Sequence, residues 1–460
     1  MDIFTALQTA VSGLKAQSYA IDNISGNIAN SQTTGYKRID TSFVDLLAEQ
    51  TPKHEVAGTV LAQSQLTNTL QGNIASTSIA TNMAVNGNGF FTVQTKTGDA
   101  NGQSTFSGTP QYTRRGDFSP DKDGYLVNGG GGYLQGQNYD PATGQVTSTG
   151  AIKIANQTLA AKPTTSITYG ANLPTSPATT ASSTSKSSLY APADTTALVT
   201  ATDGTASTGR QVAAADAATF VDNSISGPAV TAYTASGAPV SVNTRWAKIQ
   251  DATADKPAIW NLFYAADSTV SADKTAWTNA GTGFTFDSAG QLTQPSAGKA
   301  TISNLTVDGT NVGNVDLVFD RTTLTQYAAS SGAVTTNTLT QNGYAAGTLN
   351  AVSVSADGNI VGSFSNGSSV TLASVGIARF VNPDGLKPET NGTYAQTVES
   401  GVPLTGLNGA TLVGASVEAS NTDIASEFSK MIVTQQAYSA NTKVMSTAQT
   451  MMSDLLNIIR

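Results

Sequence analysis

The sequence contains no cysteine and only one histidine among its 460 residues. Without cysteine, the chain cannot form disulfides, thiolate metal sites or a cysteine nucleophile. The single histidine, His54, follows Pro52 and Lys53, where a lone imidazole is most often a solvated loop side chain. No carboxylates stand in the pattern of an acid–base pair. We therefore expect no enzymatic activity, no bound metal and no cofactor.

Charged residues are also scarce. They make up 12% of the chain, which is about half of the usual proportion, and the net charge is −8. Nucleic-acid binding is not expected, because counterion release needs clustered cations and no run of Lys and Arg is present. A polar but weakly charged surface suits a protein that packs densely against copies of itself. A β-rich secreted protein would have the same composition.

Long apolar runs are absent as well. No window approaches the ~18 apolar residues that a membrane span requires, so no membrane insertion is expected. The chain opens with Met1 and Asp2, its first cation is Lys15, and its early apolar residues are spaced rather than continuous. This differs from a cleavable secretion signal. We expect a cytosolic protein, or one exported by a route that reads no such signal.

Two short motifs resemble ligand-binding loops but lack the remaining residues. Gly87-x-Gly89 has neither the third glycine nor the following helix of a dinucleotide loop. Asp121-x-Asp123-Gly124 lacks the further carboxylates of a calcium loop. Both are interpreted as turns.

The first amphipathic segment runs from Ile3 to Ile28, with apolar residues three and four positions apart. This is the spacing of a coiled-coil seam. Its second half contains Asn23, Asn27 and Asn30, which are poor helix formers that share one face. We expect this amide face to be an interface, although a solvated face near a fraying end has the same pattern.

A second amphipathic segment runs from Asp423 to Ile459 without glycine or proline. Asn421, Thr422 or Asp423 can cap its start, and Glu427 suits the first turn. Helices with such narrow apolar stripes bury little surface alone, so both segments need partners. The predicted self-assembly seam consists of Phe4, Leu7, Val11, Leu14, Ile21, Ile28, Ile424, Phe428, Met431, Tyr438, Met445, Met452, Leu456 and Ile459.

The residues between these segments are mostly β in pattern. Residues 33–70 are expected to be irregular, with one possible short helix at 43–47, and the β pattern begins at Gly72. Near the end of the β region, Asp357-Gly358 and Asn366-Gly367 separate three short alternating stretches, which predicts a meander.

The middle of the chain changes in composition. Residues 174–218 are rich in Ser, Thr and Ala, which is typical of a flexible or loosely ordered linker. Strand-like stretches follow at 240–242, 259–264, 283–286 and 315–319, and all three tryptophans, Trp246, Trp260 and Trp277, lie in this block. We therefore expect the middle to be a separate β domain with its own core.

Motifs at both ends and in the interior resemble the flagellar rod and hook family, and within it the hook type. The motifs are Ser12-Gly13-Leu14, Asn27-Ile28-Ala29-Asn30, Thr34-Gly35-Tyr36-Lys37, Gly87-Asn88-Gly89-Phe90-Phe91, Arg114-Arg115-Gly116-Asp117-Phe118, Gly124-Tyr125-Leu126, the stretch 284–292, Ala419-Ser420-Asn421-Thr422-Asp423, Glu427-Phe428 and the stretch 435–441. The chain departs from the family at Ser31-Gln32, where Asn-Thr is common, and in the run that begins at Pro174. The family-motif residues expected at interfaces are Asn23, Asn27, Asn30, Gly35, Tyr36, Asn421, Asp423 and Asn441.

The resemblance implies a nested α+β fold that is mainly β. Terminal helices (1–34 and 421–460) would form a coiled-coil inner domain lining a channel, followed by a connecting region (35–71). A discontinuous β domain (72–163 and 336–420) would form the tube wall, and an inserted outer β domain (164–335) would face outward.

The resemblance also implies a function and partners. The chain would be a structural subunit of the bacterial flagellar hook, outside the cell, polymerising into a curved flexible tube that transmits motor torque to the filament. Its partners would be copies of itself, the distal rod, the hook cap, the hook–filament junction proteins and the flagellar type III export apparatus. The alternatives are a distal rod or junction protein, or a secreted β-rich adhesin or binding module.

Overall fold

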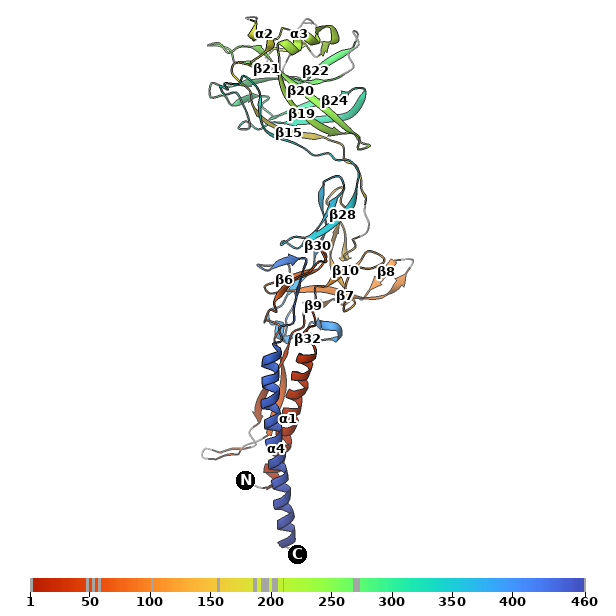
Figure 1. Cartoon of the computed structure of the whole chain (residues 1–460), viewed down its shortest axis with the longest axis vertical. Helices are drawn as coiled ribbons and strands as arrows, with labels where there is room; N and C mark the ends of the chain where they lie inside the picture. Colours follow the sequence, from red (N-terminus) through yellow and green to blue (C-terminus); the bar gives the residue numbers. More distant parts are fainter. Residues whose placement is uncertain are drawn as a thin grey trace. The chain divides into compact units, whose positions relative to one another are not determined.

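The computed structural model (Figure 1) describes residues 3–46, 49–51, 54–56, 59–100, 103–154, 158–184, 188–191, 198–200, 206–209, 211–267 and 274–458. The chain divides into two compact units. Unit 1 is formed by Met1–Gln157 together with Leu349–Arg460, and unit 2 is Thr158–Thr348. The predicted fold class is confirmed at this level, since the chain is mainly β with a helix near each end.

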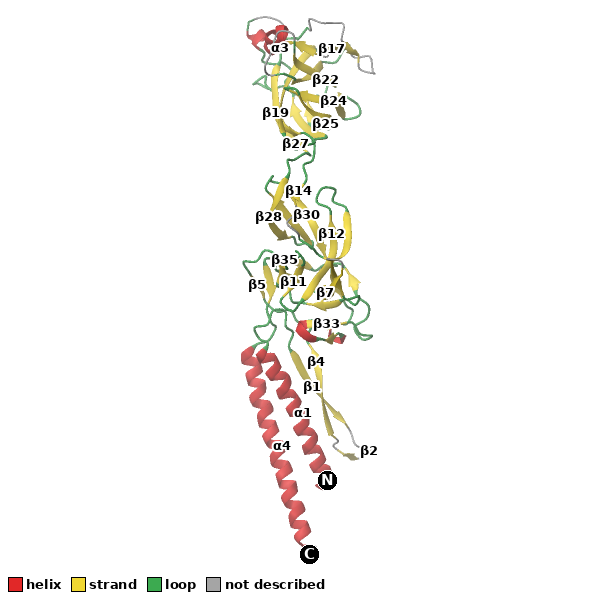
Figure 2. Cartoon of the chain, turned by 90° about the vertical axis from the view of Figure 1, so that its right-hand side faces the viewer, coloured by secondary structure: helices red, strands yellow, loops and turns green. Residues whose placement is uncertain are grey.

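Unit 1 contains the two long helices, α1 (Ile3–Ala29) and α4 (Ile424–Ile458). They lie side by side in both views (Figures 1 and 2). Asp423 caps α4, because its carboxylate accepts hydrogen bonds from the backbone N–H groups of Ala425 (2.9 Å) and Ser426 (3.2 Å). Among the described residues, no helix is long and apolar enough to span a membrane.

A long hairpin runs beside α1. Its strands are β1 (Ile39–Leu46) and β4 (Thr59–Leu66), which pair antiparallel, and its tip carries the short pair β2 (Glu49–Thr51) and β3 (His54–Val56). The expected short helix at 43–47 is therefore wrong for the described residues 43–46. One turn of helix has little intrinsic stability, whereas β1 forms a ladder with β4 over its full length and packs against α1.

The β region of unit 1 is built from two segments, one before and one after unit 2 in the sequence. Its central strands are β7 (Phe90–Ala100), β9 (Gln111–Thr113), β12 (Gly132–Tyr139), β28 (Gly347–Val354), β29 (Asn359–Phe364) and β30 (Ser369–Val375). Shorter strands of the same sheet are β8 (Gln103–Phe106), β10 (Phe118–Pro120), β11 (Leu126–Asn128), β13 (Val146–Ala151), β31 (Ile377–Arg379), β32 (Lys387–Pro388), β33 (Thr393–Ala395) and β34 (Leu404–Thr405). The strand β14 (Thr158–Leu159), which pairs with Gly347 and Thr348 at the start of β28, belongs to unit 2. Two small pairs complete the region: β5 (Ile74–Ser76) with β36 (Ser416–Glu418), and β6 (Met83–Asn86) with β35 (Thr411–Gly414).

One hydrophobic core joins the two halves of this β region. Residues of the first half, such as Phe91, Phe118 and Leu134, are buried together with Ile360 and Leu412 of the second half. The ring of Phe91 meets that of Phe118 edge-on at 5.4 Å between centroids. Neither half could bury these side chains alone, so the two halves fold as one body.

The predicted meander near the end of the β region is confirmed. Strands β28, β29 and β30 pair in order and antiparallel. Gly358 and Gly367 take positive φ values of 81° and 79°, as the two Asx-Gly turns require.

The two larger sheets of unit 2 surround its main core. The six-stranded sheet comprises β18 (Gln211–Ala213), β19 (Ile225–Tyr233), β20 (Pro239–Gln250), β21 (Ile259–Ala265), β22 (Thr275–Phe286) and β23 (Leu292–Gln294). The five-stranded sheet comprises β15 (Ser166–Asn172), β24 (Lys299–Val307), β25 (Thr310–Val318), β26 (Leu324–Thr325) and β27 (Thr335–Gln341). Trp246, Trp260 and Phe284 are fully buried in this core, as expected for a middle block with its own interior.

The expectation that 174–218 is a linker is wrong for its described residues. They include the short helix α2 (Thr180–Ser183), whose start has a complete capping box, and the hairpin of β16 (Leu198–Thr200) with β17 (Ala206–Gly209). The short helices η1 (Ala214–Asp216) and α3 (Ala217–Asp222) follow. Tyr190 and Phe220 form a small second core with Phe263, so a few apolar residues anchor a segment that is otherwise poor in them.

Gly116 provides a test of the packing in the β region of unit 1. A Cβ at this position would lie 1.7 Å from the backbone oxygen of Met83. Since a backbone atom cannot move aside cheaply, we predict that Gly116→Ala lowers the free energy of unfolding by about 2 kcal/mol or more. Thermal unfolding measures the change. Gly108→Ala is the matched control, because a Cβ there meets no atom within 4 Å, and it should stay within about 0.5 kcal/mol of the parent chain.

Candidate assembly surface

The buried side chains of α1 and α4 are mostly small or polar. The buried residues of α1 are Ala10, Gly13, Ala16, Ala20, Ile24 and Asn27. On α4, Glu427, Thr434 and Ala448 are buried and Asn441 is half-buried, so the contact residues recur every seven positions. A Cβ at Gly13 would lie 2.9 Å from the amide nitrogen of Asn441. Side chains this small let the two backbones approach closely.

No described side chain of the predicted self-assembly seam is fully buried in the single chain. Four seam residues are exposed: Phe4 (64%), Ile424 (43%), Phe428 (50%) and Tyr438 (40%). Those that are half-buried are Leu7, Val11, Leu14, Ile21, Ile28, Met431, Met445 and Met452. The side chain of Leu456 and all of Ile459 lie outside the described residues. Both helices therefore carry large apolar side chains that the single chain covers only in part.

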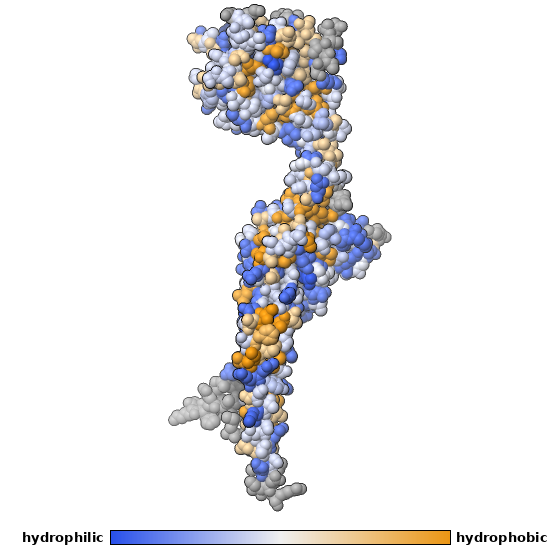
Figure 3. Space-filling view, in the orientation of Figure 1, coloured by the Kyte–Doolittle hydropathy of each residue, from blue (hydrophilic) through white to orange (hydrophobic). Residues whose placement is uncertain are grey.

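Large apolar side chains consequently remain open on the helix pair. Hydrophobic residues gather on the part of the pair nearest the β region (Figure 3), where Ile424, Phe428 and Ile432, spaced four residues apart on one face of α4, are exposed. This surface costs free energy in water unless something covers it.

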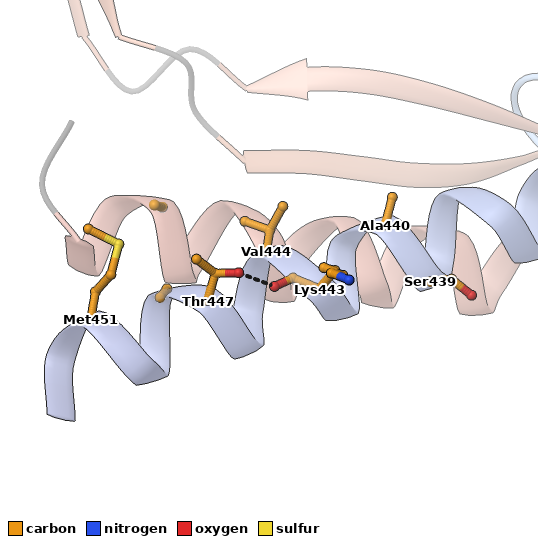
Figure 4. Close-up of a pocket in the computed structure, with 8 residues that line it drawn as sticks. Ser439, Ala440, Lys443, Val444, Thr447 and Met451 are labelled. Carbon is orange, nitrogen blue, oxygen red and sulfur yellow. Dashed lines mark hydrogen bonds between the residues drawn. The ribbon is translucent and has the colours of Figure 1, made fainter. Parts of the chain in front are cut away.

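A groove runs along the helix pair toward the far end of α4 (Figure 4). Its volume is about 670 Å³, and it is lined by Ala6 of α1 together with Ala440, Val444, Ala448 and Met451 of α4. Lys443 is its one charged lining residue among those described. The lining is mostly apolar, so the groove is a second open apolar surface on the same helices.

The hairpin covers another face of α1 through hydrogen bonds. The hydroxyl of Ser12 donates to the backbone oxygen of Val60 at 2.6 Å and accepts from its N–H at 2.9 Å. Farther along, the Asn23 amide donates to the Thr41 hydroxyl at 2.9 Å. The two hydrogen bonds of Ser12 take the place of a cross-strand pair, so the helix is bonded directly to the edge of β4.

Asn27 is the centre of the polar network where the helices meet the β region. Its side chain is fully buried, and its amide nitrogen donates to Glu427 Oε2 (3.0 Å) and to the Ile39 oxygen (2.9 Å). Its oxygen accepts from the Tyr36 hydroxyl (3.1 Å) and the Ile39 N–H (2.9 Å). Burial, and then the charge of Glu427, raise the pKa of Tyr36, so its hydroxyl stays protonated and can donate.

The charge of Glu427 is balanced at the same place. Its side chain is fully buried, and its Oε1 accepts from Lys430 Nζ at 2.7 Å. Lys430 also binds Asp40 on the hairpin at 2.9 Å. Glu427 was expected only to suit the first turn of a helix, and the sequence carries no signal that it faces Asn27.

The other family-motif residues have different surroundings. Asn30 bonds within its own helix, to the Gly26 oxygen at 2.9 Å. Asn421 joins the chain before α4 to the chain after α1, because its oxygen accepts from the Arg38 N–H at 2.7 Å. Gly35 has φ of 68° and leaves no room for a Cβ, which would lie 2.6 Å from the backbone of Arg114 and Arg115. The structure therefore brings Asn27, Tyr36 and Asn421 to one region, whereas Asn441 lies halfway down α4.

Four family models match successive parts of the chain. They are described as flagella basal body rod protein (residues 7–37), flagellar hook protein FlgE/F/G D1 domain (84–172), flagellar basal body protein FlaE D2 domain (201–344) and flagellar basal body rod FlgEFG protein C-terminal (413–458).

Full-length relatives and a solved structure are also similar. The flagellar hook protein FlgE of Salmonella typhimurium is 30% identical over 459 residues, covering 98% of each chain. That of Rhizobium meliloti is 28% identical over 478 residues and covers all of both chains. The crystal structure of Helicobacter pylori flagellar hook protein FlgE2 has a TM-score of 0.51 at 14% identity, covering 75% of this chain and 100% of that one, which shows likeness of fold.

Asn27 and Asn30 form a matched pair for testing the polar network. Asn27→Ala would leave the buried Glu427 carboxylate, the half-buried backbone of Ile39 and the Tyr36 hydroxyl without this partner, whereas Asn30→Ala removes only bonds local to its own helix end. We predict a loss of about 2–3 kcal/mol for Asn27→Ala and less than about 1 kcal/mol for Asn30→Ala. Urea unfolding measures both. Equal losses in the two variants would contradict the central role of Asn27.

Proposed function

We propose, from the premise that the chain belongs to the flagellar hook protein family, that it is the structural subunit of a bacterial flagellar hook. Copies of the chain polymerise into a curved, flexible tube outside the cell, and the tube transmits motor torque to the filament. The subunit acts as a universal joint and not as an enzyme.

The proposal rests on the different surroundings of small and large side chains on the terminal helices. Small and polar residues close α1 against α4, whereas Ile424, Phe428 and Ile432 remain exposed. An isolated subunit gains nothing from such a surface, but a neighbouring copy can cover it and bury the apolar area. The predicted seam then acts between copies.

The four-part division follows from the same proposal. Residues 1–34 and 421–460 form the inner domain around the channel, and 35–71 connect it to the tube wall formed by 72–163 and 336–420. Residues 164–335 form the outer domain. A core shared by Phe91 and Ile360 supports a wall domain made of two segments. Export is through the flagellar type III apparatus, and the distal rod, hook cap and junction proteins are the partners at the ends of the tube.

Torque and bending place different demands on these domains. Long helices with interlocked side chains resist torsion, because a packed interior has few voids into which it can deform. The outer surface is polar but weakly charged, so no strong ion pair holds neighbouring outer domains in one register. They can slide as each row of subunits lengthens and shortens during rotation. The rod, junction and adhesin alternatives are less suited, since the full-length relatives are hook proteins.

Phe428 and Val433 test the seam. Both are exposed apolar residues of α4, at 50% and 65%, but only Phe428 belongs to the predicted seam. We predict that Phe428→Glu prevents tube formation in electron micrographs, because a carboxylate buried between copies would lack a partner. Val433→Glu should still form tubes, and both variants should keep the parent's thermal unfolding midpoint. Loss of tubes in both would contradict the seam as the specific interface.

A further inference from the structure

Three charged side chains from distant parts of the sequence meet inside unit 1. They are Lys37, just after α1, Arg114, just after β9, and Glu418, the last residue of β36 before α4. The exposed fractions of their side chains are 1%, 3% and 0%. We call these three residues the root triad. Charged side chains are almost never this deeply buried unless they are paired.

Glu418 is the shared partner in the triad. Its Oε1 accepts from Lys37 Nζ at 2.5 Å and from the backbone N–H of Gly72 at 2.8 Å. Its Oε2 accepts from Arg114 Nη1 at 3.2 Å. Both oxygens of the carboxylate are therefore occupied, each by a donor from a different segment of the chain.

Backbone carbonyls satisfy much of the remaining capacity of the two cations. Lys37 Nζ donates to the Leu70 oxygen, and Arg114 donates to the oxygens of Val85 (3.3 Å) and Gly87 (2.8 Å). The Arg114 guanidinium also lies over the ring of Phe90, 5.2 Å from its centroid. Burial lowers the pKa of Lys37, and the ion pair with Glu418 opposes that shift.

The triad ties both helix ends to the β region at one point. The chain leaves α1 through Gly35, whose N–H donates to the backbone oxygen of Glu418 at 2.7 Å. The chain enters α4 shortly after Glu418 itself. Arg114 reaches the same carboxylate from the β region, where it is bonded to carbonyls on either side of Asn86. The segments that lead out of α1 and into α4 are thus both anchored at Glu418.

A buried ion triad adds little to the free energy of unfolding. Desolvation of the charges offsets most of their attraction, so apolar residues of similar volume can often replace such a group without loss of stability. Its hydrogen bonds are directional, however, whereas apolar contacts allow neighbouring elements to slide and repack. Such a group can therefore favour one arrangement of the neighbouring elements over others of similar energy.

We propose that Lys37, Arg114 and Glu418 act as positioning residues that hold the helix pair in one direction relative to the β region of unit 1. The consequence for assembly rests on the proposed function: a fixed direction in each copy limits how the helix pairs of neighbouring copies can meet, so the triad makes the tubes uniform from one to the next.

The test compares an apolar triad with single changes of Glu418. Lys37→Met/Arg114→Met/Glu418→Met removes all three charges at similar volume. Glu418→Gln leaves two buried cations without their anion, and Glu418→Asp keeps the charge on a shorter side chain. Spin labels on introduced cysteines at Gln436 of α4 and Lys122 of the β region, in a chain that has no native cysteine, report the distance between the two parts in the monomer.

The expected results separate positioning from stability. Glu418→Gln should lower the unfolding midpoint strongly, and the apolar triple variant should recover most of that loss. The label-to-label distance should be narrowly distributed in the parent chain, broad in the triple variant and shifted in Glu418→Asp. Tubes of the triple variant should vary in curvature from one to the next.

Two results would overturn the proposal. One is a narrow, parent-like distance distribution in the triple variant or, if that variant does not fold, in Glu418→Asp. The other is an unfolding midpoint in the triple variant as low as in Glu418→Gln, which would make the triad a stabilising group. Failure of the parent chain to form tubes would instead contradict the proposed function, while the distance measurement in the monomer would still decide the positioning role.

Discussion

The structure of unit 1 depends on the close approach of two helices that begin and end the chain. Gly13 faces Asn441, and Asn27 bonds to the buried carboxylate of Glu427. Both contacts require small or polar side chains at positions where an ordinary helix pair would have leucine. Other bulky apolar residues, such as Ile424 and Phe428, remain exposed, so they can meet other molecules.

The same constraint explains why the β region must be assembled from two distant segments. The helices can meet only if residues near 30 and residues near 420 are brought together. The shared core of Phe91, Phe118 and Ile360 does this, and the root triad then joins the helix ends to that core. The pairing of segments so far apart in sequence is costly in chain entropy before the contacts form. The length of the middle insertion adds little to this entropy cost, since loop-closure entropy grows slowly with length.

Unit 2 is built differently from unit 1. Its core contains Trp246, Trp260 and Phe284 between two sheets and includes no residue of the terminal helices. A self-contained body can be carried on the outside of an assembly and move against its neighbours without loosening the part that holds the subunits together. The low content of charged residues fits this role, because few ion pairs are available to lock neighbouring bodies in place.

The sequence by itself determined the local elements. Apolar residues three and four positions apart, without proline, specified α1 and α4, and the Asx-Gly pairs at 357–358 and 366–367 specified the meander of β28 to β30. The reason is that these signals act over a few residues. Only the tertiary structure decided which face of each helix is buried, because periodicity shows that a stripe is apolar but not what covers it. It also decided that 39–46 is a strand, that Asn27 faces Glu427, and that Lys37, Arg114 and Glu418 share one site. Each of these depends on a partner far away in sequence.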